Sequence, residues 1–164
     1  MKSNILKKIL FSIISCIFIT NCFAQENYVD GHNVLISMVA MNHLFSGKMQ
    51  MRDYEKSYQT LFQHKNKKGK PIPFKNVDIG KMSAFLEVHF VVDSCNNMKD
   101  AIDRGSLVFV VMPDGDIYNA IAVVGYQENG GRFIFIHPDF GTLYTLPKKR
   151  FDDKSTYYEI TGIN

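Results

Sequence analysis

The stretch DIYNAIAVVGYQENGGRFIFIHPDFGTLY, from Asp116 to Tyr144, decides the fold class of this chain. Within it, YNAIAVVGY and RFIFIH are apolar runs of strand length, and the Asn-Gly pair of QENGG between them predicts a tight hairpin. PDFG forms a further turn before the next strand, TLYTL. Asn119 opens the first strand and His137 closes the second. Polar residues at strand ends beside a cleft often carry catalysis, so both are candidate site residues.

The sequence on either side of this stretch predicts helices followed by strands. SLVFVVM before it is a strand, PDGD is a turn and YYEITG is a candidate fifth strand. Upstream, apolar residues recur at helical spacing, and VHFVV is a short strand candidate. Helices that precede an antiparallel sheet define an α+β domain. The predicted helices cover 34–45, 53–64, 78–87 and a short segment through Ile102; their end signals are Ser46-Gly47 after the first, Asp78 before the third, and Ser94 or Asn96 before the fourth.

Residues 1–24 have the features of a secretory signal. Three lysines precede the uncharged run ILFSIISCIFIT, which falls short of the about 20 apolar residues that span a bilayer. Ala24 predicts a cut that leaves Gln25 first, and the alternative is a lipoprotein signal with Cys22 lipidated, although the asparagine before it fits poorly. The chain is therefore expected to be exported, periplasmic or extracellular, as a single domain over 25–164 with no integral membrane anchor after signal removal.

Charge and cysteine content narrow the possible partners. The chain has 19 Lys+Arg and 16 Asp+Glu, but three of the lysines lie in the signal, which leaves the expected mature domain balanced. The expected mature domain lacks the excess of basic residues that nucleic-acid binding usually requires. The basic cluster KNKKGK is typical of a solvated loop. Only Cys95 of the three cysteines lies outside the signal, so no intramolecular disulfide is expected.

The order of these parts is similar to that of the papain-like cysteine peptidases of family 39, the bacteriocin-processing type that cuts after double-glycine leaders. NAIAVVGY resembles the strand that begins with the catalytic His, and IHPDFG resembles the segment that carries Asp-Pro. GSLVFVV looks like the strand that presents the next loop, and LPKKRF like the stretch before the final strand. The resemblance covers most of 25–162 and implies a papain-like fold, with N-terminal helices packed on a C-terminal antiparallel sheet.

The resemblance also implies where the catalytic groups of such a peptidase would stand. DGHN falls on the family's Asp-Cys-Gly-Pro stretch, which puts Gly31 at the nucleophile position after Asp30, and Gln25 at the oxyanion position. Asn119 takes the position of the catalytic His, and His137 that of the orienting Asp. Glycine has no side chain to attack a carbonyl, and asparagine does not titrate near neutral pH. The peptidase chemistry of the family is therefore expected to be absent.

The sequence offers two alternative sites that could carry a different chemistry. Cys95 near the start of a short helix is a candidate nucleophile, because a helix N-terminus lowers a thiol pKa; a partly buried structural thiol is the alternative. His32 and His137 form a candidate acid–base or metal pair, but a metal needs at least three ligands, and no metal or other cofactor is expected. Asp114 and Asp116 are interpreted as turn residues.

The sequence is compatible with three functions. The first is a catalytically inactive pseudo-peptidase that binds a peptide or protein segment in the former active-site groove. The second is an active cysteine peptidase or related hydrolase with a non-standard site, using Cys95 or the pair His32 and His137. The third is a purely structural extracellular or envelope protein. The residues expected to line the groove of the first are Gln25, Asp30, Gly31, His32, Asn119 and His137.

Overall fold

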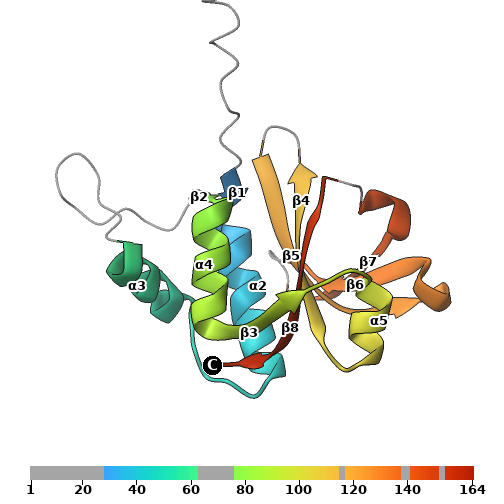
Figure 1. The fold of residues 1–164 in the computed structure, drawn as a ribbon, viewed down its shortest axis with the longest axis horizontal. Helices are drawn as coiled ribbons and strands as arrows, with labels where there is room; N and C mark the ends of the chain where they lie inside the picture. Colours follow the sequence, from blue (N-terminus) through green and yellow to red (C-terminus); the bar gives the residue numbers. More distant parts are fainter. Residues whose placement is uncertain (1–27, 63–75, 115–116, 138–140, 152–153) are drawn as a thin grey trace, which may run out of the picture.

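The computed structural model describes residues 28–62, 76–114, 117–137, 141–151 and 154–164, and these form an eight-stranded sheet with helices on both faces (Figure 1). The fold is α+β, as the sequence predicts. The signal segment lies outside the described residues. The strands are β1 (Tyr28–Asp30), β2 (Asn76–Asp78), β3 (Phe90–Ser94), β4 (Leu107–Asp114), β5 (Ile117–Gln127), β6 (Arg132–Ile136), β7 (Leu143–Pro147) and β8 (Thr156–Ile163). The helices are α2 (Gly31–Leu44), α3 (Met51–Phe62), α4 (Ile79–His89) and α5 (Met98–Asp103), with 3-10 turns η1 (Glu128–Gly130) and η2 (Lys148–Arg150).

The sheet is built around β5, its longest strand. Along the sheet the order is β2-β1-β5-β4-β8-β3, and β6 joins β5 to β7. β4 pairs along one side of β5, from Asp114 opposite Ile117 to Val108 opposite Val123. The other side of β5 is shared, because β1 pairs with its beginning and β6 with its second half. All of these pairings are antiparallel except the short parallel contact between β1 and β5.

Alternation along β4 and β5 sends side chains into two separate cores. α2, α3 and α4 pack on one face of the sheet, where Ala120 and Ala122 of β5 meet the apolar stripe of α2. The sheet curls around the other face, which α5 closes, and Ile121 and Val123 point there (Figure 1). A strand buried on both faces reads as the continuous apolar run seen in AIAVV. Because β5 is buried on both faces, its position is fixed by both cores.

The structure confirms the four predicted helices and the predicted strands, with boundary shifts of a few residues. β1 and β2, three residues each, were not predicted. Asp78 caps α4 as expected, but α5 is capped by Asn97, so the assignment of that cap to Ser94 or Asn96 is wrong. A three-residue strand shows no measurable alternation, and neighbouring Ser and Asn residues are nearly equivalent as caps.

The two predicted turn signals act differently from expectation. At the end of α2, Ser46 takes the left-handed conformation (φ 63°) and Gly47 does not. Gly47 is needed for space, because a Cβ there would lie 2.3 Å from Oδ1 of buried Asn42. The hairpin between β5 and β6 is a longer loop than the Asn-Gly pair suggests: positive φ runs through Glu128, Asn129 and Gly130, and the last ladder pair encloses four residues.

A buried carboxylate ties α5 to β8. Glu159 is 5% exposed, and it accepts hydrogen bonds from Arg104 at 3.2 and 2.6 Å and from the Ser106 hydroxyl at 2.8 Å. The hydrogen bonds from Arg104, followed by that from Ser106, hold the pKa of Glu159 below its usual value, against the effect of burial. A bidentate guanidinium contact and a hydroxyl donor satisfy both oxygens, which is the condition for keeping a carboxylate inside a protein.

Replacing Glu159 with Gln is expected to destabilise the fold in a pH-dependent way. Because the folded pKa lies below the unfolded value of about 4.3, the carboxylate contributes fully above that value, and the contribution is lost as pH falls through the folded pKa. At neutral pH we expect a loss of about 1–2 kcal/mol, a modest figure because the Arg104 side chain is 58% exposed and solvent screens it. Urea unfolding across pH should show the two stabilities converging in acid; parallel curves would contradict the assignment.

Candidate functional site

The site begins where β1 turns into α2. Val29 pairs with Tyr118 on the edge of β5, and one residue later Asp30 caps the helix. The Asp30 carboxylate accepts from the backbone N–H groups of His32 at 2.9 Å and Asn33 at 3.3 Å. Gly31, the first helical residue, is buried. The short parallel contact therefore fixes the N-terminus of a 14-residue helix beside the beginning of β5.

A gap in strand pairing lies next to this helix end. On the shared side of β5, β1 pairs at Tyr118 and β6 begins only at Ala122. α2 packs against this interval, and the Ser37 hydroxyl donates a hydrogen bond to the carbonyl of Ala120 at 3.2 Å. Asn119 stands at the start of the same interval. The sheet thus splits where the helix N-terminus meets it, and side chains can enter the split from both strands.

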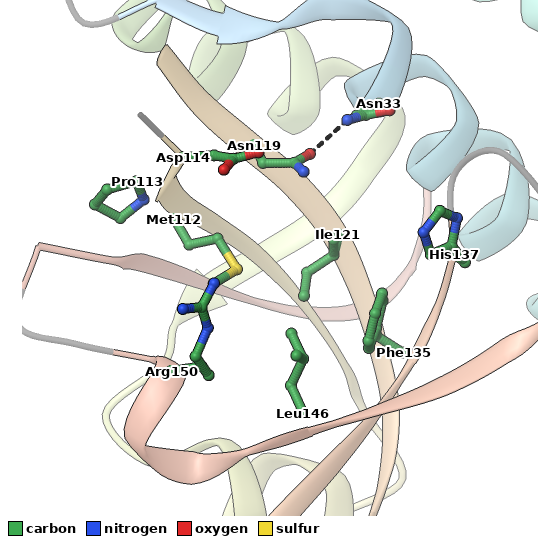
Figure 2. A pocket seen from close by; sticks show the side chains of 10 residues that line it. All are labelled: Asn33, Met112, Pro113, Asp114, Asn119, Ile121, Phe135, His137, Leu146 and Arg150. Atoms are coloured by element: carbon green, nitrogen blue, oxygen red, sulfur yellow. Dashed lines mark hydrogen bonds between the residues drawn. The ribbon is translucent and has the colours of Figure 1, made fainter. Parts of the chain in front are cut away.

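Asn33 and Asn119 join across the split. The Asn33 Nδ2 group donates to Oδ1 of Asn119 at 2.5 Å, and Figure 2 shows this bond at one end of a pocket. In the same view the amide nitrogen of Asn119 points toward the pocket. Both residues are half-buried. An amide pair holds this end of the site in place without any ionisable group.

The pocket has a volume of about 200 Å³ and opens on the curled face of the sheet. Its apolar wall comes from β4, β5, β6 and β7, while polar groups stand around the rim (Figure 2). The volume is below the about 300–1,000 Å³ of pockets that enclose a drug-sized ligand. A pocket of this size suits one or two residues of a longer chain. The lining residues are Asn33, Met112, Pro113, Asp114, Asn119, Ile121, Phe135, His137, Leu146 and Arg150.

His137 stands directly after β6 and belongs to this pocket. Its backbone N–H donates to the carbonyl of Thr142 at 2.9 Å, and its own carbonyl accepts from Gly141 at 2.9 Å. The ring lies 5.0 Å from the Tyr144 ring and 6.2 Å from the Phe135 ring, centroid to centroid. The imidazole is therefore placed by a turn and an aromatic neighbourhood.

The structure brings some of the predicted site residues together and separates others. Asn119 of β5 and His137, directly after the adjacent strand β6, line one pocket, and Gly31 lies two residues before Asn33 at its edge. Asp30 is a helix cap, and His32 is exposed on α2 and is not part of the pocket lining. The pairing of His32 with His137 in one site therefore stays a prediction. Gln25 lies outside the described residues.

Sequence reasoning missed several residues of the pocket. Asp114, interpreted as a turn residue, is the last residue of β4 and lines the pocket. Met112 shares its face by alternation, a signal that was present in SLVFVVM. The position of Asn33 in the first turn of α2 could have been derived from the Asp30 cap, which sets the register of that turn. No local pattern marks Arg150, because it closes a run of three basic residues that resembles a solvated turn.

Cys95 is not placed as a nucleophile. It lies three residues before α5 begins at Met98, whose cap is Asn97, so the expectation that it starts this helix is wrong. Burial, and then the charge of Glu159, raise the pKa of the thiol. Cys95 lines a second pocket together with Phe133, Lys148 and Tyr157 among others, apart from Asn119 and His137. These surroundings match the structural-thiol alternative and disfavour a thiolate.

Within the part of the chain that the structure describes, no three His, Cys, Asp or Glu side chains gather in a way that could hold a metal ion. In the same residues no helix combines the length and apolar character needed to cross a membrane. Neither a family model nor a curated protein sequence matches this chain.

The raised pKa of Cys95 predicts that its thiol reacts slowly with alkylating reagents. Iodoacetamide should alkylate the folded protein more slowly than the urea-unfolded protein, and the rate should rise only as pH climbs above the ordinary thiol pKa of about 8.5. Mass spectrometry of the labelled peptide measures the rate at this residue alone. Rapid labelling at mildly acidic pH would instead reveal a thiolate and would favour the hydrolase hypothesis that uses Cys95.

Proposed function

We propose that this chain is an exported, catalytically inactive protein of the papain-like family 39 peptidase type that binds a peptide or protein segment in the pocket beside Asn119. The observation that carries the proposal is that Asn119 of β5 and His137, directly after β6, line one pocket whose edge is formed by Asn33 of α2. Gly31, the first residue of α2, lies two positions before Asn33. The resemblance assigns the nucleophile, the base and the orienting acid to these positions.

The chemistry of these side chains argues against turnover. Gly31 offers no nucleophile, and the Asn119 amide, already bonded to Asn33, accepts no proton at neutral pH. Cys95 lines the other pocket, and burial raises its pKa. A groove with an oriented amide and an apolar wall can still hold a chain by hydrogen bonds and burial.

The sheet offers main-chain groups beside the pocket. Among the described strands β7 pairs only with β6, so its outer side is an edge. Leu146 of β7 lines the pocket, while Leu143 and Tyr144 on the same strand are 65% and 48% exposed. An extended peptide can add to such an edge by backbone hydrogen bonds while a side chain enters the adjoining pocket. This arrangement favours an extended peptide over a compact small molecule.

The purified full chain is expected to bind peptides without cutting them. Peptides selected from a random display library should bind in calorimetry and remain intact by mass spectrometry after prolonged incubation. Asn119→Ala should weaken binding about tenfold, the effect of losing about one hydrogen bond in the site. The matched control is Asn96→Ala in the second pocket, which should leave affinity unchanged. Peptide turnover that Asn119→Ala abolishes would overturn the proposal.

Introducing a thiol at Gly31 and an imidazole at Asn119 tests whether these are the positions of a nucleophile and its base. In a Cys95→Ser background, the thiol introduced by Gly31→Cys should alkylate slowly near pH 6 when alone. Adding Asn119→His should accelerate labelling at position 31 by about tenfold or more, because a neighbouring imidazolium lowers a thiol pKa. Both variants carry the same change at Gly31, so any disturbance of the fold is common to the two. Equal rates would show that positions 31 and 119 do not correspond to a nucleophile and its base.

A further inference from the structure

Arg150 gives the pocket a charge that the proposed function does not use. It ends η2, just after β7, and its side chain reaches toward Met112, so that the guanidinium lies beside the Met112 thioether at one side of the pocket (Figure 2). Among the described residues no carboxylate forms an ion pair with it; the ion pairs there involve Arg52, Lys99 and Arg104. A guanidinium beside an apolar wall is a strong site for a carboxylate, because its planar fork matches both oxygens.

The remaining groups of the pocket are arranged around this cation. Ile121, Phe135 and Leu146 supply the apolar wall of the same pocket. Asp114 stands at the end occupied by Asn119, away from the guanidinium in Figure 2, and the two form no ion pair. The pocket thus presents a cation, an apolar wall and an anionic acceptor in separate places. A ligand that fits all three needs an anion, an apolar group and a hydrogen-bond donor.

We propose that the pocket binds the C-terminal residue of a peptide. The terminal carboxylate pairs with Arg150, an apolar side chain lies against Ile121 and Leu146, and the N–H group of the same residue donates to Asp114. A single C-terminal residue carries all three groups within the about 200 Å³ available. An internal residue lacks the main-chain anion, and an internal Asp or Glu brings a carboxylate without the apolar group beside it. The inference rests on the proposed function and specifies its ligand.

The test compares three versions of one peptide, measured by calorimetry against the full chain. The first has a free carboxylate on an apolar C-terminal residue, the second is its C-terminal amide, and the third is that amide with one internal residue changed to Glu. The free acid should bind at least about tenfold more tightly than either amide, since hydrogen bonds to a charged group are the stronger kind. The Arg150→Gln variant should bind the free acid only as tightly as its amide, and its affinity for the amide should equal that of the unmodified protein.

Lys149→Gln is the matched control, because it removes one positive charge from the same 3-10 turn but does not line the pocket. It should leave all three affinities unchanged. Equal binding of acid and amide, with no effect of Arg150→Gln, would overturn the C-terminal inference while leaving peptide binding intact. Arg150-dependent binding of the Glu-containing amide would assign the site to an internal carboxylate and would also overturn it. Failure of every peptide to bind would overturn the proposed function itself.

Discussion

The shared edge of β5 is the constraint on which the rest of the structure depends. One strand side must serve β1 at Tyr118 and β6 from Ala122 onward, and neither reaches the residues between. α2 lies against this interval, where the Ser37 hydroxyl donates a hydrogen bond to the carbonyl of Ala120. Alanines at 120 and 122 keep the strand face low enough for α2 to pack closely against it. The helix N-terminus is thereby held at a split in the sheet, and the pocket forms there.

The sequence predicts this architecture wherever a pattern is long enough to have a period. The helical stripe of α2 and the continuous apolar run AIAVV of β5 are recognisable because they belong to elements of 14 and 11 residues. β1 and β2 are too short for that, yet β1 is what joins α2 to β5. The positions of α2 and β5 relative to each other therefore depend on a contact that no local pattern reveals.

The same limit separates the site residues that could be predicted from those that could not. Asn119 is the third residue of β5 and His137 directly follows β6, so the apolar runs of these strands place both residues approximately. The partner of Asn119 is Asn33, 86 positions earlier, and only the folded chain brings the two together. Arg150 and Asp114 have side chains that are ordinary in turns, so composition favours a solvated role for both. Their positions at the pocket depend on the sheet, because Asp114 is the last residue of β4 and Arg150 ends the 3-10 turn that follows β7.

The hydrogen-bonded amides of Asn33 and Asn119 limit the chemistry that is possible at the split in the sheet. A thiol and an imidazole placed there would exchange a proton, and their interaction would depend on pH. Asn33 and Asn119 bond at any ordinary pH, so the end of the pocket keeps one shape and one set of donors. Rigid, neutral donors favour a bound ground state, whereas catalysis needs groups whose charge changes along the reaction. Charge at this pocket is instead carried at its rim, by Arg150 and Asp114, where it can select a ligand by its ends without acting on the bonds between them.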